Sequence, residues 1–448
     1  MGEGVVETGT ARVVRRAKGI KGVVEVPGDK SISHRAAILG ALAEGTTRIE
    51  RLAPGRDVGK TLSCLHALGV GIEYGPAPVE VTIEGVGAPS GGAGWKVPDG
   101  PLDCGNSGTT ARMLAGVLAG QGVDAVLAGD ESLSTRPMER IAIPLRRMGA
   151  EVELSAEGTL PMEVRGGGLT GITYSSPVAS AQVKSAVLFA GLGASGVTEH
   201  IEPVRSRDHT ERLLKQFGAD IDTHASGGGR GEYRVRLDPG SPLKGQEIAV
   251  PGDISSAIFL AVAALLVPRS ELIMKGVGLN PGRREALRVL DRMGADIEIK
   301  DRRTSGGESR GDLHVSYSKL TGTGISGSSV PWLIDEIPAL AVAAAFAEGE
   351  SYVKGAEELR NKESDRIHAL VHNLRLLDLE VGEFPDGFVL RGKQSHDAAE
   401  FESFGDHRIA MAFHVAALAC HGESIIRGYE AVEVSWPDFP DVLEALAV

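Results

Sequence analysis

Residues 26–43 read VPGDKSISHRAAILGALA, and this stretch holds both the turn and the helix on which the predicted fold is built. Pro27-Gly28-Asp29 predicts a turn, and Ser31 is placed to cap the apolar helix that follows. Lys30 and Arg35 lie within about one turn of the helix start, where the helix dipole is already positive. An anion held by both cations, the Ser31 hydroxyl and free helix N–H groups would resolve this conflict. A solvated basic turn is the alternative.

The helix in this stretch belongs to a segment that recurs six times along the chain. Each copy has a helix rich in small apolar residues, a glycine or polar stop, and a short β-like run. A second, charged helix follows and ends in motifs such as Met-Gly-Ala, after which the sequence alternates as in a strand. Each copy is therefore predicted as strand, buried helix, strand, amphipathic helix and two strands. The first helices end near positions 45, 122, 196, 270, 349 and 422, so the copies lie 73 to 79 residues apart.

Six copies exceed what one hydrophobic core usually contains, so we predict an α/β protein of two lobes with three copies each. The opening turn supports this division, because Val26-Pro27-Gly28-Asp29 returns as Val250-Pro251-Gly252-Asp253. We expect one lobe of residues 27–248 and a discontinuous lobe of residues 1–26 and 249–448, with a cleft between them. A continuous solenoid is the alternative, but the chain lacks the atypical capping repeats that a solenoid requires.

The two copies of the turn differ in the residues that follow them. Lys30 and Arg35 come after the first copy, whereas Ile254 and Phe259 occupy the same places after the second. The turn itself therefore does not require cations, which favours an anion site at the first copy. Five other segments combine Gly, Ser, Thr or Asn with Arg or Lys at or near a predicted helix start: 104–112, 129–137, 175–184, 359–366 and 405–408.

These cations predict two anionic substrates, or one doubly anionic substrate, because arginine forks and lysine charges both bind phosphate and carboxylate. Asp335 and Glu363 lie among apolar or cationic neighbours and are candidates for general acid–base work. For Glu336 we favour simple charge compensation at a helix start, and Ser364 is the expected cap of the helix after Glu363. The cations are Lys30, Arg35, Arg112, Arg136, Arg207, Lys362, Arg366 and Arg408.

Composition excludes several other classes of protein. Lys plus Arg number 47 against 60 Asp plus Glu, a net charge of −13 that argues against nucleic-acid and anionic-membrane partners. The three scattered cysteines support neither a disulfide framework nor a zinc site, and they fit a cytoplasmic protein. No signal peptide is visible, and the apolar runs are far shorter than the roughly 20 residues that span a bilayer. Metal-binding, P-loop and dinucleotide-binding motifs are also missing from the sequence.

Eight motifs occur in order over nearly the whole chain, and together they resemble those of the 5-enolpyruvylshikimate-3-phosphate synthase family. They are PGDKSISHR, GNSGTTAR, SLSTRPM, ASAQVKSA, RDHTERLL, DEIPALAVAAA, LRNKESDRI and GDHRIAM. The resemblance implies a two-domain inside-out α/β barrel of six βαβαββ repeats, with helices buried, sheets outside and lobes that close on the substrates. It implies transfer of the enolpyruvyl group of phosphoenolpyruvate to the 5-hydroxyl of shikimate 3-phosphate, a step of aromatic amino acid biosynthesis. It further implies a cytoplasmic monomer that needs no metal or organic cofactor.

The resemblance also assigns roles by motif position. Asp335 takes the hydroxyl proton of the acceptor, while Glu363, with Lys362 or Lys30, moves the proton at the methylene carbon through a tetrahedral intermediate. Shikimate 3-phosphate is expected to contact Lys30, Ser31, Arg35, Ser180, Ala181 (through its backbone), Gln182, Arg207, Asp335 and Lys362. Phosphoenolpyruvate is expected to contact Lys30, Gly108, Arg136, Gln182, Arg366 and Arg408.

One departure from the resemblance and three rival interpretations stay open. Some members carry a C-terminal lysine in the phosphoenolpyruvate site, but residues 434–440 offer none. The glycine at Gly108 leaves room for glyphosate, so we expect sensitivity to it. The sister enolpyruvyl transferase that acts on UDP-N-acetylglucosamine usually has a loop cysteine, and residues 132–137 have none. RNA-end processing and non-catalytic anion binding are the remaining alternatives.

Overall fold

The computed structural model describes residues 10–448 apart from 77–78, 88–93, 227–230 and 306. The chain divides into two compact units. Unit 1 holds residues 252–303 and 310–448 together with the N-terminal residues up to Val26, and unit 2 holds 27–251 and 304–309. The division after residue 251 lies three residues beyond the expected one, and segment 304–309 belongs to the other unit from the one we assigned.

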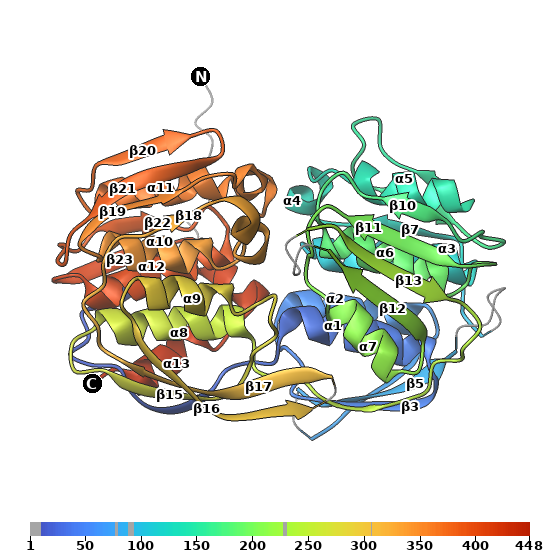
Figure 1. The fold of residues 1–448 in the computed structure, drawn as a ribbon, viewed down its shortest axis with the longest axis horizontal. Helices are drawn as coiled ribbons and strands as arrows, with labels where there is room; N and C mark the ends of the chain where they lie inside the picture. Colours follow the sequence, from blue (N-terminus) through green and yellow to red (C-terminus); the bar gives the residue numbers. More distant parts are fainter. Residues whose placement is uncertain (1–9, 77–78, 88–93, 227–230, 306) are drawn as a thin grey trace. The chain divides into compact units, whose positions relative to one another are not determined.

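Unit 2, drawn in blue to green in Figure 1, contains three copies of a βαβαββ pattern. In each copy the first strand pairs parallel with the second, which pairs antiparallel with the last strand of the copy. The first copy is β14 (Glu247–Ala249), α1 (Lys30–Leu42), β3 (Glu44–Glu50), α2 (Arg56–Ala67), β4 (Gly71–Tyr74) and β5 (Val81–Val86). The second is β6 (Leu102–Asp103), α3 (Gly108–Gln121), β7 (Ala125–Ala128), α4 (Glu131–Ser134), α5 (Glu139–Met148), β8 (Glu151–Glu153) and β9 (Met162–Arg165). The third is β10 (Thr173–Ser175), α6 (Ala181–Gly191), β11 (Thr198–Glu202), α7 (His209–Gln216), β12 (Asp220–Ala225) and β13 (Tyr233–Asp238).

Unit 1 repeats the pattern, but its third copy ends differently. The first copy is β2 (Lys21–Glu25), α8 (Ile254–Leu266), β15 (Glu271–Gly278), α9 (Glu285–Arg292), β16 (Asp296–Ser305) and β17 (Glu308–Ser316). The second is β18 (Gly324–Ile325), η2 (Gly327–Trp332), α10 (Ile337–Ala345), β19 (Gly349–Val353), η3 (Glu357–Asn361), α11 (Arg366–Leu376), β20 (Val381–Phe384) and β21 (Gly387–Gly392). The third is β22 (Glu400–Glu402), α12 (His407–Ala419), β23 (Glu423–Arg427), η4 (Tyr429–Val434) and α13 (Phe439–Leu446). Its three-stranded sheet takes its remaining strand from the N-terminal β1 (Arg12–Arg15).

The two units exchange the strands that open their first copies. Strand β2 directly precedes α1 in the sequence, yet it pairs with β15 of unit 1. Strand β14 directly precedes α8, yet it pairs with β3 of unit 2. The chain therefore passes from one unit to the other at both copies of the Pro-Gly-Asp turn. At the first copy Gly28 is needed for close packing, because a Cβ there would lie 1.7 Å from the carbonyl oxygen of Arg51.

Each unit has its own hydrophobic core, and the first helix of every copy lies inside it. Helices α1, α3, α6, α8, α10 and α12 are buried along nearly their whole length, whereas second helices such as α5 bury one face. This confirms the two predicted helix types. Helices α3 and α6 lie side by side (Figure 1), and a Cβ at Gly116 would come within 2.2 Å of the Ala186 carbonyl oxygen. None of the helices in the described part of the chain is long and apolar enough to cross a membrane.

Two of the predicted helix caps are wrong. Helix α1 begins at Lys30, and its cap is Asp29, whose carboxylate accepts a hydrogen bond from the Ile32 N–H at 2.9 Å. Helix α11 is capped by Asp365, which accepts from the His368 N–H at 3.0 Å, instead of by Ser364. In both cases an aspartate near the predicted serine takes the position, because it too can accept from the first-turn N–H groups.

Candidate functional site

In unit 2 the predicted residues gather at the starts of the first helices. Lys30 and Ser31 open α1, Gly108 opens α3, and Ser180 caps α6 by accepting from the Val183 N–H at 3.4 Å. Helix α1 packs against α3, and α3 against α6. Among the described residues, none of these three first turns contains an acidic side chain. Their N–H groups and hydroxyls therefore form an environment suited to an anion.

The starts of α3 and α6 are joined by Gln182. Its side-chain carbonyl accepts from the Arg112 guanidinium at 2.8 Å, and its amide nitrogen donates to the Thr109 hydroxyl at 3.0 Å. Arg112 was counted among the cations but was not given a role by motif position. An arginine in the first turn of an otherwise apolar, buried helix is the sequence signal that could have singled it out.

Lys30 and Arg35 find part of their partners inside the protein. Lys30 forms an ion pair with Asp57, at the start of α2. The Arg35 guanidinium, 2% exposed as a residue, donates to the Thr210 hydroxyl at 2.6 Å, the Ser185 hydroxyl at 3.0 Å and the Ser31 carbonyl at 2.8 Å. The positive charges at the start of α1 are thus accommodated partly by protein groups, which the sequence argument did not consider.

Arg207 and Arg136 approach these helix starts from loops. Arg207 donates to the Ser31 hydroxyl at 3.3 Å. Arg136 follows α4 and donates to the Ser132 hydroxyl at 3.2 Å and to the backbone and side-chain oxygens of Asn106. Asn106 belongs to the loop that opens α3, so Arg136 is held beside Gly108. A Cβ at Gly108 would lie 2.8 Å from a terminal nitrogen of Arg112, so this position has little spare room.

In unit 1 the predicted acids and arginines converge on one buried guanidinium. Arg366, at the start of α11, is 1% exposed. Its terminal nitrogens donate to Glu363 at 2.5 Å and to Asp335 at 3.4 Å. Arg408, in the first turn of α12, donates to the Asp335 backbone carbonyl at 2.8 Å. The starts of α10, α11 and α12 therefore bring together residues up to 73 positions apart in the chain.

Asp406 completes this group and was missed by the sequence analysis. It caps α12 by accepting from the Arg408 N–H at 2.8 Å, and it accepts from the Arg366 Nε at 2.7 Å. Burial alone would lower the pKa of Arg366, but the charges of Asp406, Glu363 and Asp335 hold that pKa above its ordinary value. The Asp335 and Glu363 side chains keep 18% and 21% exposure, so both can still reach a ligand.

Two further residues of unit 1 lie near this group in sequence. Lys362 donates to Glu358 at 2.8 Å. Glu336 occupies the N-cap position of α10 but makes no side-chain cap hydrogen bond; its carboxylate pairs with Arg283 at 3.3 Å and accepts from the Ser255 hydroxyl. Its charge is therefore balanced by an arginine side chain, and the interpretation as compensation of a helix start is corrected accordingly.

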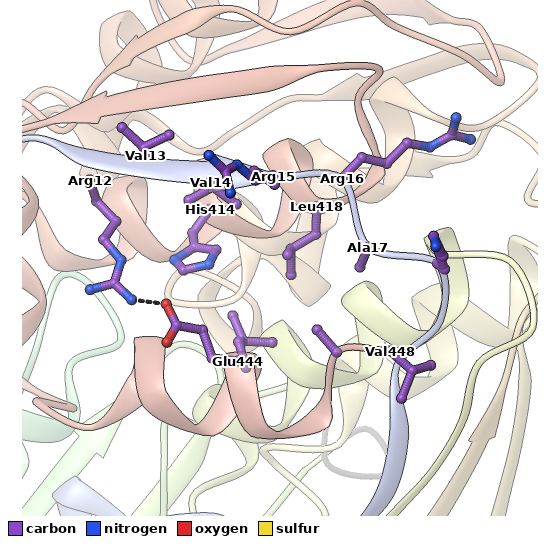
Figure 2. A pocket seen from close by; sticks show the side chains of 13 residues that line it. Arg12, Val13, Val14, Arg15, Arg16, Ala17, His414, Leu418, Glu444 and Val448 are labelled. Atoms are coloured by element: carbon purple, nitrogen blue, oxygen red, sulfur yellow. Dashed lines mark hydrogen bonds and ion pairs between the residues drawn. The ribbon is translucent and has the colours of Figure 1, made fainter.

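The pocket shown in Figure 2 is separate from the predicted site residues. It measures about 500 Å³ and lies in unit 1 between β1, α12 and α13. Arg12 is directed at Glu444 across it (Figure 2). None of the predicted site residues is among those that line this pocket.

Cys104 bears on the rival enolpyruvyl transferase, because it is the nearest cysteine to the Arg136 loop in the sequence. It is fully buried, and the free Cys64 beside it is buried as well. The Cys64 thiol and burial raise the pKa of Cys104 well above its ordinary value. A thiol in this state is a poor nucleophile.

The fold places the chain among proteins built like enolpyruvyl transferases. The enolpyruvyl transferase NikO from Streptomyces tendae superimposes with a TM-score of 0.74 over 98% of both chains at 18% identity, which shows the fold alone. EPSP synthase from Acinetobacter baumannii superimposes with a TM-score of 0.85 at 43% identity, again over 98% of both chains. A 3-phosphoshikimate 1-carboxyvinyltransferase from Desulforamulus reducens is 48% identical over 437 residues, covering 97% of this chain and 99% of its own.

The family model for EPSP synthase (3-phosphoshikimate 1-carboxyvinyltransferase) matches residues 14–443. The chain belongs to the EPSP synthase family. This confirms the resemblance inferred from the eight motifs.

Proposed function

We propose that this chain transfers the enolpyruvyl group of phosphoenolpyruvate to the 5-hydroxyl of shikimate 3-phosphate and releases phosphate. The observation that carries this proposal is the family match over residues 14–443, supported by whole-length relatives named 3-phosphoshikimate 1-carboxyvinyltransferase. The reaction belongs to aromatic amino acid biosynthesis. We propose further that the enzyme works as a cytoplasmic monomer without a metal or organic cofactor, and that each unit is one lobe of an inside-out α/β barrel.

In this proposal most contacts to shikimate 3-phosphate come from unit 2, and Asp335 and Lys362 of unit 1 complete the site. The start of α6 offers the Ser180 hydroxyl, the backbone N–H of Ala181 and the Gln182 amide, and helix N-termini favour phosphate. Arg207 and Lys30 supply positive charge, and the Ser31 hydroxyl lies 3.3 Å from Arg207. Arg35 is also proposed to contact shikimate 3-phosphate, and its guanidinium donates to the Ser31 carbonyl at 2.8 Å, which fixes the backbone at Ser31.

We propose that phosphoenolpyruvate binds in the predicted cleft and that both units contribute cations to its site. From unit 2 come Arg136 and Lys30, with Gln182 and Gly108. From unit 1 come Arg366 and Arg408. Arginine forks match carboxylate and phosphate oxygens with paired hydrogen bonds, which suits a ligand that carries both groups.

The proposed chemistry is addition followed by elimination. Asp335, with Lys362 nearby in the acceptor site, takes the proton of the 5-hydroxyl as that oxygen attacks C2 of phosphoenolpyruvate. Glu363, with Lys362 or Lys30, delivers a proton to C3, which gives a tetrahedral intermediate. Loss of phosphate and return of the C3 proton then leave the enolpyruvyl ether. The Arg366 guanidinium, 2.5 Å from Glu363 and 3.4 Å from Asp335, would orient both acids for these steps.

The test is a phosphate-release assay with phosphoenolpyruvate and either shikimate 3-phosphate or UDP-N-acetylglucosamine as acceptor. We expect release only with shikimate 3-phosphate, and loss of release in Asp335→Ala while shikimate 3-phosphate still binds. Release with the sugar nucleotide alone would overturn the proposal in favour of the sister transferase. Binding of both substrates without release would favour a non-catalytic protein.

A further inference from the structure

Unit 2 contains a buried lysine that the proposed mechanism does not use. Lys184 lies on α6, is 0% exposed, and forms ion pairs of 2.8 Å with both Glu202 and Glu211. Its ammonium group also sits 5.0 Å from the centre of the Tyr233 ring. One cation and two carboxylates are thus enclosed within the core of a single unit.

Stability alone gives little reason for such a group. Removing charges from water is costly, and well-packed apolar residues of similar volume often stabilise a core as well or better. Burial raises the pKa of Glu211, and the charge of Lys184 only partly opposes this shift. Burial would lower the pKa of Lys184, but the charges of Glu211 and Glu202 outweigh it and raise that pKa. The lysine therefore stays charged, and a role in positioning is the explanation that fits.

Glu202 connects the lysine to the loop that carries Arg207. It ends β11, and the same carboxylate oxygen that meets Lys184 accepts from the Ser206 N–H at 2.8 Å and from the Ser206 hydroxyl at 3.0 Å. Ser206 is the residue directly before Arg207. The position of Lys184 thus fixes the backbone from which the Arg207 side chain extends.

Lys184 is also attached to the start of α6. Its backbone N–H donates to the Ser180 carbonyl at 3.0 Å, one helical turn away. Ser180 and Arg207 come from different elements. Lys184 is connected to both, because its side chain pairs with Glu202, which holds the Arg207 loop, and its backbone N–H is bonded to Ser180. Glu211, the second partner, lies on α7, which follows the Arg207 loop.

We propose that Lys184 is a positioning residue for shikimate 3-phosphate, because through Glu202 it holds the Arg207 loop in register with the start of α6. This inference rests on the proposed function, in which Arg207 and Ser180 contact that substrate. Lys184 itself touches no substrate.

The decisive variant is Lys184→Met, which keeps the length of the side chain and removes its charge. We expect the KM for shikimate 3-phosphate to rise by at least about tenfold, the size expected when a charged hydrogen bond is lost. The kcat at saturating substrate should stay within about threefold. Lys244→Met is the matched control, since Lys244 pairs with Glu44 on the surface of the same unit, and its kinetic constants should not change.

A general loss of stability is separated from positioning by Phe189→Leu. Phe189 is fully buried on the same helix, so this variant should lower the melting temperature without removing any of the hydrogen bonds that Glu202 accepts. An unchanged KM in Lys184→Met, or a rise no larger than that in Phe189→Leu, would overturn the inference. Should Lys184→Met fail to fold, Glu202→Met and Glu211→Met carry the test.

The two carboxylates give opposite expectations. Glu202→Met removes the acceptor of both Ser206 hydrogen bonds and should raise the KM as much as Lys184→Met. Glu211→Met leaves the Lys184–Glu202 pair intact and should raise it less than about threefold. If Glu202→Met and Glu211→Met raised the KM equally, Lys184 would not act through Glu202 and Ser206. Arg207→Ala separates the inference from its premise. If it alone raises this KM, only the inference is wrong, whereas an unchanged KM would overturn the proposed contact of Arg207 with shikimate 3-phosphate. Wild-type enzyme that releases no phosphate with this acceptor would instead contradict the proposed function.

Discussion

Arginines lie at the helix starts of both units, but the side chains and backbone groups that they contact differ between the units. In unit 2, Arg112, Arg136 and Arg207 donate to neutral amide, hydroxyl and carbonyl oxygens. In unit 1, Arg366 pairs with three carboxylates and is almost completely buried among them. Hydrogen bonds to neutral oxygens orient a guanidinium, whereas ion pairs with carboxylates also hold those carboxylates in place. In the proposed function, the same scaffold thus supplies anion contacts in unit 2 and both anion contacts and the catalytic acids in unit 1.

The two copies of the Pro-Gly-Asp turn show that the difference between the units arises from the few residues after the turn. Asp29 and Asp253 both cap their helices, but Asp29 accepts from the N–H of Ile32 at 2.9 Å and Asp253 from that of Ser255, one position nearer, at 2.8 Å. Lys30 and Arg35 follow the first cap in the sequence. Phe259 follows the second cap, and its ring packs edge-on against that of Phe439. The same turn thus opens a helix with predicted substrate contacts in one unit, and in the other a helix that has Phe259 in the apolar core at the position of Arg35.

The largest effect that tests this comparison is expected from Asp335→Asn. If unit 1 supplies the acids, kcat should fall by about 10²–10⁴-fold, the usual contribution of a general base. The dissociation constant of shikimate 3-phosphate, measured by calorimetry, should change by less than about threefold, because most of the proposed contacts to that ligand come from unit 2 and the asparagine side chain can still hydrogen-bond to it. A variant that loses affinity but keeps kcat would reverse the roles assigned to the two units.

The next effect concerns stability and should follow Arg366→Met. The buried Asp406 would lose its partner, and breaking such a pair costs about 3–5 kcal/mol of the free energy of unfolding. Arg360→Met is the control, because that arginine pairs with Asp365 and Glu383 at a more exposed place and should cost about 1 kcal/mol or less. Urea unfolding measures both. Equal losses would show that the acids of unit 1 do not depend on the buried guanidinium.

A pH-dependent effect of intermediate size is expected in each unit. Burial lowers the pKa of His414 to about 3 in unit 1 and that of His200 to about 4 in unit 2. Both values lie below the ordinary value of 6.5, so the unfolded chain takes up a proton first as the pH falls. The stabilisation is complete above about pH 6.5 and is lost towards pH 4, at about 2 kcal/mol per histidine between pH 7 and 5.

The measurement for this effect is urea unfolding at pH 7 and pH 5. His414→Gln and His200→Gln should each remove one histidine's share of the pH dependence, while His66→Gln, at an exposed position of α2, should remove none. If the two cores unfold separately, His414→Gln will affect only the transition of unit 1. If the pH dependence of the free energy of unfolding were unchanged in both His414→Gln and His200→Gln, these two histidines would not be its cause.

The smallest effect is expected from Gly108→Ala in unit 2. The new methyl would lie 2.8 Å from Arg112, so the guanidinium must move and its bond to Gln182 must weaken. We expect the KM for phosphoenolpyruvate to rise by about tenfold, roughly 1.4 kcal/mol, and glyphosate inhibition to weaken by at least as much. Gly59→Ala is the control, because a methyl on that face of α2 meets open space. If millimolar glyphosate left the turnover of the wild-type enzyme unchanged, the expected sensitivity to glyphosate would be wrong.

Much of the fold was predictable from local sequence. The small-residue helices at 73- to 79-residue intervals predicted the six copies and the two helix types, because apolar periodicity and glycine stops act within a few residues of each other. The motifs around Lys30, Gly108, Asp335 and Arg408 placed the candidate residues at or near helix starts for the same reason. The N-caps of α1 and α11 were missed because an aspartate and a serine close to it are equally capable of capping.

The sequence by itself therefore determined the repeats, the helix starts and the family. Only the tertiary structure decided which strands β2 and β14 pair with, that Asp406 shares Arg366 with Glu363, and that Lys184 meets Glu202. The physical reason is distance along the chain. A helix or cap is selected by neighbours within one turn, but an ion pair is selected by which helix ends pack together, and packing joins residues as far apart as Arg35 and Thr210, 175 positions along the chain.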